Sequence, residues 1–176
     1  MIVALYVLIS ISVVLILISF LLPNSYTITK TLVINASPAL CYMKIADLNF
    51  YKEWNPWAKM ELNANSIISG KPNTIGHQYT WDGKKIGVGG LTITKLSPYQ
   101  SIELELEFFK PFKSKSLDVW HFEELENNMV KITWQNSGNF NTVFTRLMGP
   151  LVQKNLSKQF EKGLLNIKQL CEATKH

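Results

Sequence analysis

The feature that most constrains this chain is the run from Ile2 to Leu22, which contains no charged residue and only three serines among aliphatic and aromatic side chains. At about 1.5 Å per residue, a helix over this run is roughly 31 Å long, which matches a hydrocarbon core about 30 Å thick. The sequence therefore predicts one transmembrane helix over residues 2–22, and a short polar hinge completes an anchor segment at residues 1–25.

A cleaved signal peptide and a buried core helix are the two alternatives for this run. A signal peptide has a charged leader, an apolar run of about 7 to 15 residues and small residues at its cleavage point. Here the apolar run is longer, and Leu21, Leu22 and Pro23 occupy its exit. A core helix is typically shorter and more polar. We therefore expect a retained anchor in a single-pass membrane protein.

The side of the membrane on which the domain lies follows from the charges that flank the apolar run. Lys30 and Lys44 follow the apolar run, and the positive-inside tendency then favours a cytoplasmic domain. Cys41 and Cys171 are too few for a disulfide framework, so they do not identify the compartment.

The remainder, residues 26–176, has the length of one domain with its own core. The chain carries 18 basic and 13 acidic residues, a formal charge of +5 that is spread along this part. Nucleic-acid-binding domains typically cluster arginines, and Arg146 is the only arginine here. We therefore expect no nucleic-acid partner.

The first part of this domain predicts one strand and two short helices. Residues 26–35 alternate and are rich in β-branched side chains, which is typical of a strand. Ser37 and Pro38 suit an N-cap and a first helical position, so a helix should run from there to about Leu48. A second short helical segment is predicted over residues 49–54.

Period-two patterning over Asn65–Gln135 predicts six antiparallel strands separated by turn residues. The clearest is Ser101–Phe108, where large apolar residues alternate with three glutamates, which gives a sheet one buried and one solvated face. Gly87, Gly89 and Gly90 lie in this region with no helix start after them, so we expect a bulge or bend rather than a phosphate-binding loop.

After residue 141 the pattern becomes helical. One apolar stripe recurs through Val152, Leu156, Phe160, Leu164, Ile167 and Cys171. Gly149 and Pro150 interrupt the pattern, so a short helix should precede the long one. Gly163 implies close packing of the helix on the sheet or, alternatively, room for a ligand. A long helix with one apolar stripe fits the inner face of a bent sheet, which gives an α+β fold.

This order of elements, with the residues it carries, resembles the SRPBCC superfamily, also called START-like or helix-grip, and within it the polyketide cyclase/dehydrase-like branch. The resemblance rests on residues 34–38, 54–57, 76–81, 130–134 and 160–164. It implies a seven-stranded antiparallel sheet wrapped around the long C-terminal helix, with an apolar cavity between them. It does not imply a reaction, since the superfamily includes lipid carriers, receptors and cyclases.

Aromatic residues are the candidate ligand contacts, because large rings at alternating positions of the inner face can line a pocket as readily as fill a core. The ligand-binding candidates are Tyr79, Trp81, Trp120, Phe122, Trp134 and His77. His77 belongs to this set because it shares strand phase with Tyr79 and Trp81, whereas His121 is out of phase with Trp120 and should face water.

The sequence contains no recognisable catalytic set. His77, Asp82, Asp118, His121 and Glu123 are the candidate acid–base groups, but none forms a nucleophile, base and orienting partner at a known spacing. No histidine and cysteine set suits a metal, so we expect no metal and no cofactor.

Three functions fit these observations. The first is a non-enzymatic, membrane-anchored and monomeric binder of a hydrophobic small molecule or lipid. The second is a cyclase or dehydrase-like enzyme, which buried and perturbed ionisable groups in the cavity would favour. The third is a protein-interaction domain, which a cavity collapsed around the tryptophans would favour.

Overall fold

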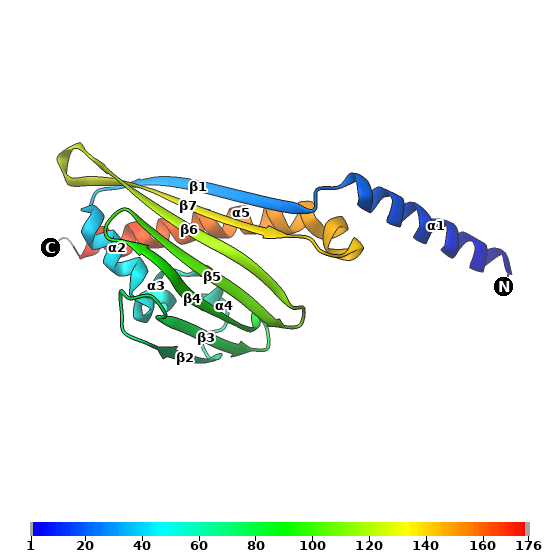
Figure 1. Ribbon diagram of the computed structural model, residues 1–176, viewed down its shortest axis with the longest axis horizontal. Coiled ribbons are helices and arrows are strands. Elements are labelled where there is room, and N and C mark those ends of the chain that lie inside the picture. Colours follow the sequence, from blue (N-terminus) through cyan, green and yellow to red (C-terminus); the bar gives the residue numbers. More distant parts are fainter. Residues whose placement is uncertain (1, 175–176) are drawn as a thin grey trace.

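The computed structural model describes residues 2–174, which form a seven-stranded antiparallel sheet, a long C-terminal helix and an apolar N-terminal helix (Figure 1). The strands are β1 (Ser25–Ile34), β2 (Asn65–Ser69), β3 (Gln78–Gly83), β4 (Gly87–Ser97), β5 (Ser101–Lys110), β6 (Ser114–Leu125) and β7 (Met129–Asn139). Their order in the sheet is β1-β7-β6-β5-β4-β3-β2. The first and last strands of the chain are therefore neighbours, and the predicted helix-grip fold is confirmed.

The helices are α1 (Ile2–Leu21), α2 (Pro38–Ala46), α3 (Tyr51–Trp54), α4 (Pro56–Met60) and α5 (Val143–Ala173), with short 3-10 turns at Leu48–Phe50 and Glu126–Asn128. The predicted helix after Ser37 is present. The Ser37 side chain accepts a hydrogen bond from the backbone N–H of Leu40, and Pro38 takes the first helical position, where its missing N–H costs nothing.

Helix α4 was not predicted, although its start signal is in the sequence. Asn55 caps it by accepting hydrogen bonds from the backbone N–H groups of Trp57 and Ala58 at 3.0 and 3.1 Å, and Pro56 follows at the first helical position. Asn55 has extended backbone angles, so α3 ends one residue earlier, at Trp54, and α4 begins as a separate helix.

The glycines of β4 provide a bend in the sheet, as predicted. The pairing of β4 with β5 shifts register between Val88 and Gly89. A Cβ atom at Gly89 would lie 2.5 Å from the Trp81 ring, so glycine here lets the indole lie against the backbone of β4. The bulge and the close approach together shape the inner face at this end of the sheet.

The prediction of a short helix before the long one is wrong, because α5 is continuous through Gly149 and Pro150. Thr142 and Thr145 form a reciprocal capping box that begins the helix at Val143. Gly149 is explained by packing instead, since a Cβ atom there would lie 2.9 Å from the Phe140 ring.

Gly163 marks a close contact between α5 and the sheet. A Cβ atom at this position would lie 2.8 Å from Cζ3 of Trp134. Of the two explanations offered for this glycine, close packing is therefore correct. The contact fixes the helix against β7 at its midpoint and leaves its two halves in different surroundings.

Helix α1 extends away from the rest of the molecule, beyond the end at which β1 and α5 begin (Figure 1). Ser19 is its only buried residue among those described. The helix is long and apolar enough to cross a membrane, and the same length and composition also suit a signal sequence.

Candidate ligand-binding site

A cavity of about 840 Å³ lies between the N-terminal half of α5 and the inner face of the sheet. It is within the range of volumes that hold small-molecule ligands. Aromatic and aliphatic side chains supply most of the wall. They include Tyr26, Tyr51, Trp57, Tyr79, Trp81, Leu106, Phe108, Phe112, Trp134, Phe140, Phe144, Met148, Val152, Leu156 and Phe160.

Three of the six predicted ligand contacts line this cavity, namely Tyr79, Trp81 and Trp134. The Tyr79 and Trp81 rings come from β3 and stack at 5.9 Å between centroids, and the Trp81 indole N–H donates to the Ile86 carbonyl at 3.3 Å. These contacts hold both rings in fixed orientations against one wall. A ligand role for them stays a prediction.

Trp120 lies behind the cavity rather than in its wall. Its indole stacks on Trp134 at 4.3 Å between centroids, and Trp134 in turn stacks on Phe160 of α5 at 4.0 Å. Trp134 therefore stands between Trp120 and the cavity. Strand phase predicted the correct face for Trp120 but not its depth.

Phe122 and His77 also lie outside the cavity wall. Phe122 packs against Tyr42 of α2, with ring centroids 5.6 Å apart, near the opposite end of the sheet. His77 is fully buried, where its Nε2 accepts from the backbone N–H of Leu48 at 3.0 Å and its Nδ1 is 2.9 Å from the Ser69 carbonyl. His77 thus ties the first 3-10 turn to the end of β2, a structural role.

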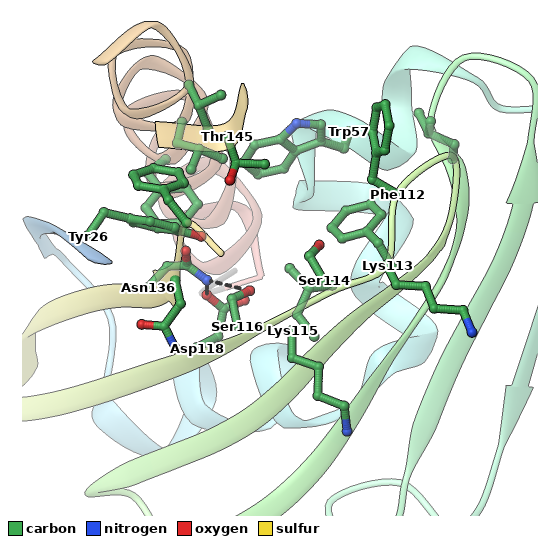
Figure 2. Close-up of a pocket in the computed structure, with 18 of the residues that line it drawn as sticks. Tyr26, Trp57, Phe112, Lys113, Ser114, Lys115, Ser116, Asp118, Asn136 and Thr145 are labelled. Atoms are coloured by element: carbon green, nitrogen blue, oxygen red, sulfur yellow. Dashed lines mark hydrogen bonds between the residues drawn. The ribbon is translucent and has the colours of Figure 1, made fainter. Parts of the chain in front are cut away.

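A polar cluster interrupts the apolar wall on β6 and β7. Oδ1 of Asp118 accepts hydrogen bonds from Nδ2 of Asn136 at 2.8 Å and from the indole N–H of Trp134 at 3.2 Å. Nδ2 of Asn136 also donates to the Ser116 hydroxyl at 3.2 Å. Figure 2 shows Asp118, Asn136, Ser116 and Tyr26 gathered on one side of the cavity.

Burial dominates the electrostatics of this cluster. Loss of water raises the pKa of Asp118 to about 6, although its hydrogen bonds with Asn136 and Trp134 act in the opposite direction. Burial, followed by the charge of Asp118, raises the pKa of Tyr26 and of Tyr51. Asp118 is thus a carboxyl group held in a site that disfavours its charge.

The mouth of the cavity is apolar and exposed. Phe112, in the turn between β5 and β6, and Phe144, in the first turn of α5, have ring centroids 6.3 Å apart and exposed fractions of 68% and 60%. Both line the cavity, as does Lys113 beside Phe112. Large apolar side chains in this position leave a hydrophobic rim facing outward.

This mouth lies at the end of the domain from which α1 extends. The backbone N–H of Phe140, a cavity residue, donates to the Asn24 carbonyl at 2.7 Å, and α1 contacts α5. Only the hinge, residues 22–24, separates α1 from β1. The opening and the apolar helix are therefore close neighbours.

Asp118 was predicted only as one of several acid–base candidates, and Asn136 and Ser116 were not predicted as site residues. A signal for the cluster exists in the strand phase. Asp118 and Ser116 share the inner phase of β6 with Trp120, and Asn136 shares that of β7 with Trp134. Polar residues on an otherwise apolar inner face are unusual and can mark a site.

No family model matches the sequence, and no curated protein matches it. Solved structures do share the fold. StfQ, a di-domain ARO/CYC from the steffimycin biosynthetic pathway, is 11% identical with a TM-score of 0.66, over 86% of this chain and 52% of its own. Ara h 8.0201 is 9% identical with a TM-score of 0.61, over 85% of this chain and 99% of its own. The Aha1 dimer from Colwellia psychrerythraea is 19% identical with a TM-score of 0.56, over 86% of this chain and 99% of its own.

These likenesses are to structures under 20% identical in sequence, so they concern the fold alone. They are consistent with the SRPBCC superfamily fold that the sequence resembles. The cavity between α5 and the sheet, with its polar cluster, is a feature of this chain that stands independently of the neighbours.

Proposed function

We propose that this protein is a membrane-anchored binding domain for a hydrophobic small molecule or lipid, which it holds between α5 and the sheet. The observation that carries the proposal is the cavity of about 840 Å³ with a mainly aromatic and aliphatic wall. Transfer of an apolar ligand from water into a cavity of that size and lining is favourable, because the apolar surface of the ligand is buried.

The position of the mouth supports the membrane part of this proposal. Phe112 and Phe144 place exposed apolar rings at the opening, on the end of the domain next to α1. If α1 spans a bilayer, the short hinge keeps this rim near the membrane surface. A poorly water-soluble ligand could then pass between bilayer and cavity without crossing much water.

An enzyme of the cyclase or dehydrase type is the second candidate, and Asp118 is the observation that favours it. A carboxyl group with a pKa near 6 inside a cavity can accept or give a proton at neutral pH. One of the fold neighbours is described as an ARO/CYC. However, the hydrogen-bond partners of Asp118 are an amide and an indole, which supply no second acid or base.

If the protein were a protein-interaction domain, the cavity was expected to be collapsed around the tryptophans. Trp54, Trp120 and Trp134 do pack together, with edge-to-face centroid distances of 5.6 and 5.8 Å from Trp54. This cluster lies beside the cavity and does not fill it. We therefore rank interaction with a protein partner last.

Native mass spectrometry of the full-length protein, released from lipid nanodiscs, tests whether the protein carries a dedicated apolar ligand. We expect a co-purifying apolar molecule of one mass class bound at one copy per chain. Protein that carries only the phospholipids of the nanodisc, at variable copy number, would count against a dedicated ligand.

Membrane fractionation tests whether α1 is a retained membrane span. Full-length protein should stay with membranes through a high-salt and alkaline carbonate wash, and deletion of residues 1–23 should release a soluble monomer, because β1 starts at Ser25 and Asn24 is retained. Release of the full-length chain by carbonate, or an N-terminus that starts after the apolar run, would show that α1 is not a retained span.

A further inference from the structure

The cavity contains one acidic side chain, and that side chain is only half satisfied. Asp118 is the only carboxylate among the residues that line the cavity, and its exposed fraction is 6%. Both of its hydrogen bonds reach Oδ1. Within residues 2–174, Oδ2 receives no hydrogen bond, and it is not one of the fully buried atoms that lack a partner, so it is open to the cavity.

Oδ2 is therefore an acceptor that remains available at the cavity surface, and a ligand that donates a hydrogen bond to it gains a charge-assisted contact within a mainly apolar wall. The three groups around Asp118 also fix its position. Trp134 is clamped between Trp120 and Phe160, and Asn136 is held by Ser116, so the carboxylate cannot easily turn away from the cavity.

We propose that Asp118 selects among apolar molecules, so that the cavity takes those with a hydroxyl or a protonated amine and rejects those with a carboxylate. This inference rests on the proposed function, since it concerns the ligand of the same cavity. An apolar body would fill the aromatic part of the space, and its donor group would reach Oδ2 on β6.

The charges near Asp118 are compatible with this selection. Tyr26 on β1, Tyr51 on α3 and Tyr79 on β3 face the cavity, and burial raises the pKa of each, so all three are neutral at pH 5 to 8. The lining residues of α4 and α5 carry no ionisable group.

Two lysines stand at the rim. The Lys115 Nζ is 2.6 Å from a carboxylate oxygen of Glu107 and 3.5 Å from one of Glu105, so its charge is balanced by neighbours on β5. Lys113 lines the mouth next to Phe112. A ligand carboxylate held there by Lys113 is the competing arrangement, and it would give the opposite preference.

A matched series of four naphthalenes tests the inference with the full-length protein in nanodiscs: 2-methylnaphthalene, 2-naphthalenemethanol, 2-(aminomethyl)naphthalene and 2-naphthoate. Equilibrium dialysis gives each affinity, with empty nanodiscs subtracted. At pH 7.5 we expect the amine to bind about tenfold or more tightly than 2-naphthoate, with the alcohol between the amine and the methyl compound or equal to the amine.

The variant Asp118→Asn keeps an oxygen for Asn136 and Trp134 and turns an amide N–H₂ toward the cavity. It should bring the amine and 2-naphthoate to within about threefold of each other, or reverse them. Asp82→Asn, at an exposed position of β3, is the matched control and should leave the preference unchanged. Circular dichroism checks that both variants are folded.

A pH series on the unmodified protein gives the same information without a variant. Near pH 5 Asp118 should carry its proton, and a neutral carboxyl can donate to 2-naphthoate but holds an amine less well. The preference for the amine should therefore shrink several-fold between pH 7.5 and pH 5.

The outcomes separate the two proposals. If 2-methylnaphthalene and the other three fail to bind, the proposed function fails. If all four bind with equal affinity, or if 2-naphthoate binds best at pH 7.5, the binding cavity stands and the selection by Asp118 is wrong. Loss of the preference in Asp82→Asn as well as in Asp118→Asn would also overturn it.

Discussion

The two halves of α5 meet the same sheet in different ways. In the C-terminal half, Leu164, Ile167 and Cys171 are almost completely buried against the sheet and α2. In the N-terminal half, Val152 and Leu156 remain partly exposed and face the cavity. Gly163 and Phe160 lie at the boundary between the two.

The inner faces of β6 and β7 change in the same direction. Reading β6 toward the end nearest α1, Phe122 and Trp120 give way to Asp118 and Ser116. On β7, Trp134 gives way to Asn136. The packed half uses large apolar side chains for stability, whereas the open half combines empty space with polar groups, which costs stability. Such a division is typical of a ligand site built onto a stable core.

Phe160→Ala tests the packed side of the boundary and should have the largest effect. Removing a ring that stacks on Trp134 at 4.0 Å should lower the free energy of unfolding by about 3 to 5 kcal/mol. Lys158→Ala, two residues earlier on the exposed surface, should cost less than about 0.5 kcal/mol. Urea unfolding followed by tryptophan fluorescence measures both, and equal midpoints would show that α5 does not pack in this phase.

Asp118→Asn tests how much stability the buried carboxylate of the open half costs. This variant should raise the free energy of unfolding, whereas Phe160→Ala lowers it. The folded-state pKa of about 6 lies above the ordinary value of 3.8, so the folded protein loses stability as pH rises from about 4 to 6. At pH 7 the cost is fully present, up to roughly 3 kcal/mol at 1.36 kcal/mol per pH unit. The variant should therefore be more stable at pH 7, and its advantage should disappear near pH 4.

The control for this change is Asp82→Asn, at an exposed position of β3. Its stability should follow that of the unmodified protein at every pH. An Asp118→Asn variant that is less stable than the unmodified protein at pH 7 would mean that the carboxylate contributes net stability, and the open half would then not be a functional compromise.

Gly163→Ala tests how tightly α5 packs on the sheet at the boundary between its two halves, and it should have a smaller effect. Alanine improves helix propensity by up to about 1 kcal/mol, but its Cβ atom would lie 2.8 Å from a Trp134 ring that is clamped on both faces. We expect overpacking to exceed the gain, for a net loss of about 1 to 2 kcal/mol by urea unfolding. A gain in stability would show that the contact at Gly163 is loose.

Sequence periodicity predicted most of the fold because the strands and the long C-terminal helix have clear patterns. The six strands of Asn65–Gln135, the first strand and the apolar stripe of α5 follow directly from period two and period 3.6. The continuity of α5 could not be read in this way. Gly149 fits against Phe140, a tertiary contact, and so it does not interrupt the helix.

The site was less predictable than the fold, for a physical reason. Strand phase identifies the face on which a residue lies but not its position along the face or its depth. Trp134 and Trp120 share the inner face, yet only Trp134 lines the cavity. Phe112 and Phe144 could not be predicted as a mouth at all, because only the folded chain brings the β5–β6 turn next to the start of α5.

The most direct test of the open half is to fill it. In Val152→Trp, an indole should occupy the cavity below α5, and Leu165→Trp adds the same ring at a position of α5 that is 53% exposed. With full-length protein in nanodiscs, equilibrium dialysis of 2-methylnaphthalene should show at least a tenfold loss of affinity for Val152→Trp and unchanged affinity for Leu165→Trp, while both keep the circular dichroism of the unmodified protein. Unchanged affinity in the folded Val152→Trp variant would contradict the account, because the ligand would then bind somewhere other than the space between α5 and the sheet.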